Sequence, residues 1–294
     1  MPSFRKVKAY SRAGYLLLKT PMTGALLPRR LSGGKRSVFS FRVFSWEIWK
    51  TIAKRKKASK GSYLAVEAFA QYIKRIDELM DRLSAPSLIQ QELAYRRDPE
   101  ARKLISKYVG QVKWLPLLKD QKKEIFNLSG NFRRHVLKVM GDFEKIQNPT
   151  FTEVLKMKKQ INGEMAKMLF GIFNVSENVP IAKRAQIEQA FSDMSMAGQI
   201  MDDIFDVKVD MAKHVPNLCT AALGMHLEEL QRVADADKIS FKWFRKSCPK
   251  TNQRLMNLFE NYLERIPNTP EQFQVMAAIP RLFMRILLLT NRKK

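Results

Sequence analysis

Cysteine and histidine are scarce in this sequence. Its 294 residues include two cysteines, Cys219 and Cys248, and three histidines. The two cysteines do not form a CxxC pair, and so few cysteines and histidines give no recognisable set of zinc ligands. The sequence therefore supports neither a disulfide framework nor a zinc site, and a reducing, cytoplasmic setting fits it best.

Long apolar runs and alternating patterns are also lacking. No run of about 18 apolar residues occurs, so we expect no membrane-spanning helix. No stretch alternates clearly enough to predict a sheet, whereas long segments have helical periodicity and are separated by prolines. The sequence therefore predicts an all-α fold. With 45% apolar content, we expect one large helical domain over residues 31–294 after a basic segment at 1–30.

Acidic residues are nearly absent from the first 60 residues, which contain 16 Lys and Arg and one acid, Glu47. The rest of the chain carries +10 of the net charge of +25. Such an arm suits an anionic membrane surface, a phosphate-bearing substrate or nucleic acid, and it also resembles a transit peptide. No nucleic-acid-binding motif accompanies the charge, so we expect no nucleic-acid partner.

The C-terminal segment 281–290 is apolar and is followed by basic residues. This pattern is typical of a packed final helix, and the alternative is a peripheral membrane contact.

Residues 199–210 place four carboxylates within nine residues of an otherwise apolar run. At about 100° per residue, one stripe of a helix would hold the polar members of this segment. The stripe comprises Gln199, Asp202, Asp203, Asp206 and Asp210. Like charges one turn apart repel by about 0.2–0.5 kcal/mol per pair, and Mg²⁺, which prefers carboxylate oxygens, would remove that penalty. The alternative is an acidic face that is solvated or paired with Lys and Arg.

A second carboxylate pair lies on a predicted helix from residue 62 to about 83. Asp77 and Asp81 are one turn apart, with Lys74 nearly one turn earlier on the same face. A salt-bridged surface pair is a common alternative, but two acidic clusters on buried helices together suggest a shared Mg²⁺ site.

A third block combines glycine with positive charge. Gly33 and Gly34 precede Lys35 and Arg36, and residues 37–57 then have helical periodicity. Glycines let the backbone turn sharply, and two cations beside a helix N-terminus suit a diphosphate. The alternative is a plain connector in a basic region.

These three blocks, in this order, resemble the class I isoprenoid synthases, most closely the trans-prenyl diphosphate synthases. Residues 33–36 are similar to that family's first block, and 77–81, Asp-Glu-Leu-Met-Asp, to its first aspartate-rich motif. Residues 199–210 look like its second motif, a Gln followed by DDxxD. The two acidic segments are also similar to those of squalene and phytoene synthases. The resemblance covers nearly the whole chain.

The resemblance implies a helical bundle with a central active-site cavity, in which Mg²⁺ and basic residues hold an allylic prenyl diphosphate for ionisation. Prenyl transfer to isopentenyl diphosphate is the reaction implied most closely, because the glycine block is retained. A terpene synthase that cyclises one prenyl diphosphate is an alternative, as is a non-catalytic, membrane-associated protein that keeps the fold. Homodimerisation stays open.

The resemblance also assigns residues. The implied metal ligands are Asp77, Asp81, Asp202, Asp203, Asp206 and Asp210, and the catalytic residues among them are Asp77, Asp81, Asp202 and Asp206. The implied diphosphate-binding residues are Lys35, Arg36, Lys74, Lys158, Lys159, Gln199 and Lys213.

Three features depart from the family pattern. No Arg-Arg pair closely follows Asp81, since Arg96 and Arg97 lie further on, and Ala70 stands where the family has histidine. The family's Lys-Thr-Gly block is reduced to residues 158–163. The metal half of the implied site is therefore retained, whereas the second-substrate half is altered.

Overall fold

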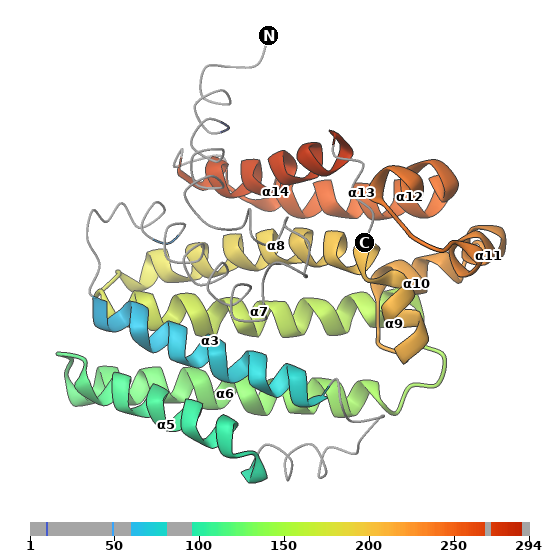
Figure 1. Ribbon diagram of the computed structural model, residues 1–294. Helices are drawn as coiled ribbons and strands as arrows, with labels where there is room; N and C mark the ends of the chain where they lie inside the picture. Colours follow the sequence, from blue (N-terminus) through green and yellow to red (C-terminus); the bar gives the residue numbers. More distant parts are fainter. Residues whose placement is uncertain (1–9, 11–48, 50–59, 81–95, 268–271, 290–294) are drawn as a thin grey trace. The chain divides into compact units, whose positions relative to one another are not determined.

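The computed structural model describes residues 10, 49, 60–80, 96–267 and 272–289 (Figure 1). Its regular elements are all helices, and no β-strand occurs in this part of the chain, which confirms the predicted all-α class. None of the helices described is long and apolar enough to cross a membrane. The glycine block at 33–36 lies outside the described residues, and of the helix predicted over 37–57 the structure describes Trp49 alone.

The chain divides into two compact units. The first unit comprises residues 1–15, 143–163 and 189–294, and the second comprises residues 16–142 and 164–188. Two long helices, α7 (Phe151–Ser176) and α8 (Ile181–Phe205), contribute residues to both units. The single domain expected over residues 31–294 stays a prediction.

In the second unit, α3 (Lys60–Met80) packs against α5 (Pro99–Trp114). The rings of Phe69 on α3 and Tyr108 on α5 have centroids 4.8 Å apart. Asp98, the N-cap residue of α5, accepts hydrogen bonds from Arg75 Nη2 at 2.7 Å and from the Ala101 N–H at 2.7 Å. The bond from Arg75 is the main reason that the pKa of Asp98 is lowered. The start of α5 is thereby fixed to α3.

The second unit also contains α6 (Lys119–Phe143) and the C-terminal half of α7. Phe170 and Phe173 of α7 are fully buried, with ring centroids 6.3 Å apart. The ring centroids of Trp49 and Phe173 are 5.4 Å apart, with the ring planes tilted by 35°, and the Trp49 indole N–H donates to Asn174 Oδ1 at 3.0 Å. The complete burial of Phe170 and Phe173 is typical of core residues.

In the described part of the first unit, six helices follow α8. They are α9 (Val207–Lys213), α10 (Leu218–Leu223), α11 (Leu227–Asp235), α12 (Phe241–Ser247), α13 (Pro249–Arg265) and α14 (Gln272–Leu289). On α14, Phe273, Met276 and Ile279 are buried, as expected for a packed helix. The packing that α13 makes with α10 and α12 joins these elements into one core.

The N-terminus of α13 is capped by a side chain from α11. The N-cap residue of α13, Cys248, makes no side-chain capping hydrogen bond. The buried Glu229 carboxylate accepts hydrogen bonds from the backbone N–H groups of Lys250 and Thr251, each at 2.9 Å. Burial opposes ionisation of Glu229, but the bonds from Thr251 and Lys250 outweigh it and lower its pKa. A negative charge here also suits the positive end of the helix dipole.

Glu229→Ala is expected to lower the free energy of unfolding at pH 7 by about 2–3 kcal/mol, because two hydrogen bonds to a charged acceptor are lost. The folded-state pKa of Glu229 is lowered, so its ionised form contributes stability above the unfolded-state pKa of about 4.3. That contribution disappears as the pH falls through the folded-state pKa. In urea unfolding, the difference in free energy of unfolding between variant and wild type should therefore be large at pH 7 and much smaller in acid.

The control for this prediction is Glu228→Ala. Glu228 is the neighbouring carboxylate on α11, but its side chain is 89% exposed, and its Oε2 lies 3.7 Å from Arg232 Nη2. Removing it should change the free energy of unfolding by less than about 0.5 kcal/mol. If Glu229→Ala were no more destabilising than Glu228→Ala, the capping role would be wrong.

Candidate functional site

The acidic stretch is not one continuous helix. The first helix, α8, ends at Phe205, and α9 begins at Val207, with Asp206 between them at φ −94° and ψ 6°. The single helix predicted over residues 199–210 is therefore wrong at Asp206. In a continuous helix the Asp203 carbonyl would accept the Val207 N–H, and here it accepts Asn217 Nδ2 at 2.8 Å. This competition and the weak helix propensity of aspartate explain the break.

The break leaves the aspartates one turn apart. The Asp206 N–H donates to the Asp202 carbonyl at 2.9 Å, and the Asp210 N–H donates to the Asp206 carbonyl at 2.8 Å. Asp202 is exposed, whereas Asp206 and Asp210 are partly buried. The backbone thus keeps these three aspartates at the one-turn spacing that the sequence predicted, despite the break.

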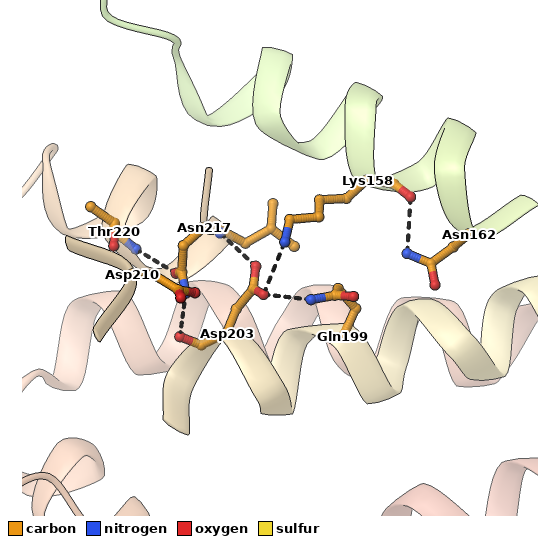
Figure 2. A network of polar contacts seen from close by, with 8 residues as sticks. Lys158, Asn162, Gln199, Asp203, Asp210, Asn217 and Thr220 are labelled. Atoms are coloured by element: carbon orange, nitrogen blue, oxygen red, sulfur yellow. Dashed lines mark hydrogen bonds and ion pairs between the residues drawn. The ribbon is translucent and has the colours of Figure 1, made fainter. Parts of the chain in front are cut away.

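Asp203 has a different environment, which Figure 2 shows. Its side chain is 2% exposed. Oδ1 accepts hydrogen bonds from Gln199 Nε2 at 2.6 Å and from Lys158 Nζ at 3.3 Å, and Oδ2 accepts the Leu218 N–H at 2.7 Å. A buried carboxylate needs such partners, because its desolvation would otherwise cost several kcal/mol. Asp203 therefore joins α7, α8 and the start of α10.

Asn217 is the residue that sequence reasoning missed. Its Nδ2 donates to the Asp203 carbonyl and to Asp210 Oδ2, at 2.8 and 2.7 Å. Its Oδ1 accepts the Thr220 N–H at 3.0 Å and caps the N-terminus of α10 (Figure 2). The signal was an Asn after Pro216 and directly before the apolar Leu218-Cys219, which is a typical N-cap pattern. One side chain thus positions both α10 and the acidic stretch.

Negative charge is concentrated around Asp210. Burial is the main cause of its raised pKa; the Asp206 and Asp203 carboxylates raise it further, whereas the bond from Asn217 and the charge of Lys158 lower it. A divalent cation in this position would offset the repulsion among these groups. The donors also suit Mg²⁺, because carboxylate oxygens are the hard ligands that it prefers. The chemistry of Asp202, Asp206 and Asp210 therefore fits the predicted metal.

The remaining predicted site residues are divided between the two units and the residues that the structure does not describe. Lys159 and Lys213 are exposed in the first unit, and Lys74 lies on α3 in the second unit. Asp77 also lies on α3, but its side chain is outside what the structure describes. Lys35, Arg36 and Asp81 lie outside the described residues.

Within the described ranges, no three His, Cys, Asp or Glu side chains converge closely enough to hold a metal ion. The predicted site, however, also requires Asp81 and the Asp77 carboxylate, which are outside these ranges. The meeting of the two acidic clusters therefore stays a prediction.

The fold and this site define an all-α protein with a hydrogen-bonded acidic cluster in its first unit. Comparison of the chain with protein-family models, curated proteins and solved structures finds no match.

Proposed function

We propose that this protein is a Mg²⁺-dependent isoprenoid synthase that ionises an allylic prenyl diphosphate and joins the resulting cation to isopentenyl diphosphate. The observation that carries the proposal is the row of carboxylates Asp202, Asp206 and Asp210, set one turn apart and supported by the buried Asp203. The sequence resemblance described above and the all-α class agree with it.

In the proposed site, Asp202, Asp206 and Asp210 would hold Mg²⁺ together with Asp77 and Asp81. When bound, Mg²⁺ would neutralise charge on the diphosphate leaving group. The protein's own contribution is to fix these carboxylates before substrate arrives. Asn217 orients Asp210 by donating a hydrogen bond at 2.7 Å, so little reorganisation remains at the moment of reaction.

Positive charge next to the carboxylates serves the substrate. Lys158 Nζ lies 3.3 Å from Asp203 Oδ1, and its side chain is 15% exposed, so this amine is held in place on α7. The exposed Lys159 and Lys213 add positive charge in the same unit. In the proposal these cations and Gln199 bind the diphosphate, and Lys35 and Arg36 bind that of the second substrate. A central apolar cavity would protect the allylic cation from water.

The test is to incubate the purified full chain with Mg²⁺ and geranyl, farnesyl or geranylgeranyl diphosphate, with and without isopentenyl diphosphate. Products and released diphosphate are measured by mass spectrometry and a colorimetric assay. We expect a longer prenyl diphosphate, formed only when isopentenyl diphosphate is present. A hydrocarbon formed without it would identify a terpene synthase instead, and no diphosphate release from any substrate would support the non-catalytic alternative.

A further inference from the structure

Three large apolar side chains are exposed at one end of the second unit. Trp114 at the end of α5 is 87% exposed, Leu118 before α6 is 75% exposed, and Ile181 at the start of α8 is 80% exposed. Figure 1 shows the end of α5, the start of α6 and the α7–α8 connection at the same end of these helices. Single exposed apolar residues are ordinary, but several at one end of a unit mark an interaction surface.

Contacts between these segments hold the three side chains at this end. Lys122 Nζ of α6 donates to the carbonyl of Lys113 on α5 at 2.7 Å. Gln121 Nε2 of α6 donates to Asn178 Oδ1 in the α7–α8 connection at 2.6 Å. Arg184 of α8 forms an ion pair with Glu124 of α6 at 2.9 Å. Each contact joins segments that carry the exposed residues.

The connection between α5 and α6 is anchored. Leu115 is 3% exposed, and its N–H donates to the Val112 carbonyl at 3.2 Å. The Leu117 N–H donates to the Leu115 carbonyl at 2.8 Å, and the Leu118 N–H donates to Gln121 Oε1 at 3.1 Å. The exposure of Trp114 and Leu118 therefore follows from a hydrogen-bonded connection in which Leu115 faces the core.

The charge around these side chains is positive. Segments 113–124 and 177–184 contain six basic and three acidic residues. The basic residues are Lys113, Lys119, Lys122, Lys123, Lys183 and Arg184, and the acidic residues are Asp120, Glu124 and Glu177. Of the acidic residues, Glu124 pairs with Arg184 and Glu177 accepts a hydrogen bond from Ser62. These segments therefore carry more positive than negative charge, and the lysines exposed in them are Lys113, Lys119, Lys123 and Lys183.

We propose that this surface, formed by Trp114, Leu118, Ile181 and the surrounding lysines, docks on an anionic lipid bilayer. Tryptophan is suited to the membrane interface, and lysines beside it are attracted by anionic headgroups. A second copy of the chain is a poorer occupant, because two such surfaces would bring like charges together. The proposal is independent of the proposed enzymatic activity and of the basic first 60 residues.

The test compares the full chain with a triple variant, Trp114→Ser, Leu118→Ser and Ile181→Ser, by cosedimentation with vesicles. The vesicles are phosphatidylcholine alone or an equimolar mixture with phosphatidylserine. We expect the triple change to weaken binding to the mixed vesicles by about tenfold or more, since three apolar side chains no longer insert. Lys119→Gln should weaken it by about fivefold, because one basic residue near such a surface contributes about 1 kcal/mol.

The matched control is Met225→Ser with Leu227→Ser. These side chains, 45% and 73% exposed, lie in the first unit, away from the proposed surface along the chain. All variants keep the basic N-terminal arm. A loss of vesicle binding in the triple variant, but not in this control, would therefore locate the membrane contact at the proposed surface. A blue shift of tryptophan emission on vesicle binding, abolished by Trp114→Phe, would support insertion.

Circular dichroism checks that each variant is folded. The proposal would be overturned if the wild type did not bind mixed vesicles, or if the triple variant bound them as tightly as the wild type does. It would also be overturned if the triple variant no longer self-associated but still bound vesicles like the wild type. The last result would assign the surface to a second copy of the chain.

Discussion

Asp206→Asn is expected to reduce diphosphate release by at least about a hundredfold. In the proposed site the substitution removes one of the charges that hold Mg²⁺, and such sites supply several kcal/mol of transition-state stabilisation. Folding should be nearly unchanged, because asparagine keeps the shape of aspartate. Stability without metal should even rise slightly, since the repulsion between Asp206 and Asp210 falls.

The control for Asp206 is Asp237→Asn, which removes an exposed carboxylate of the same unit. It should leave turnover unchanged. Binding of Mn²⁺, followed by electron paramagnetic resonance, should weaken in Asp206→Asn and stay unchanged in Asp237→Asn. Turnover like that of the wild type in the folded Asp206 variant would contradict the proposed role of this residue.

Asp203→Ala is expected to lower the free energy of unfolding by about 3–5 kcal/mol, the usual cost of removing one partner from a buried ion pair. The substitution deprives Lys158 Nζ, Gln199 Nε2 and the Leu218 N–H of their common acceptor. Asp203→Asn should cost less, because its amide oxygen can still accept hydrogen bonds. Urea unfolding at neutral pH measures both changes.

The comparison residue for Asp203 is its neighbour Asp202, which is exposed. Asp202→Ala should change the free energy of unfolding by less than about 0.5 kcal/mol. Because the two aspartates are adjacent in the sequence, a difference in stability between the two variants would reflect the burial of Asp203 and not its place in the chain. Similar effects of the two substitutions would refute the organising role of Asp203.

The all-α class could be predicted because apolar periodicity is a local property of the sequence. Helix α3 illustrates this: the pattern predicted a helix from residue 62, and the structure begins it at Lys60. The break at Asp206 could not be predicted in this way. It accompanies a hydrogen bond from Asn217 to the carbonyl of Asp203, and that bond depends on how the chain returns after α9.

The spacing within the acidic stretch could be predicted for the same reason. The spacing correctly placed Asp202, Asp206 and Asp210 one turn apart, which is a helical property. Asp203 was assigned to metal binding together with Asp202, because the two adjacent aspartates cannot be told apart in the sequence. Its burial and three protein partners arise from α7 and α10 and have no local signature. The roles of Lys35, Arg36 and Asp81 stay predictions, since these residues lie outside the described ranges.

The backbone at the α8–α9 junction has a consequence for ion selectivity. The carbonyls of Asp202 and Asp206 accept hydrogen bonds from the backbone N–H groups one turn later. They are therefore engaged along the helix axis, and a cation held at the proposed site would rely on carboxylates and water. Calcium sites commonly recruit backbone carbonyls into a large, flexible shell, whereas Mg²⁺ keeps several waters and needs few carboxylates. The engagement of these two carbonyls would thus favour the smaller ion over Ca²⁺.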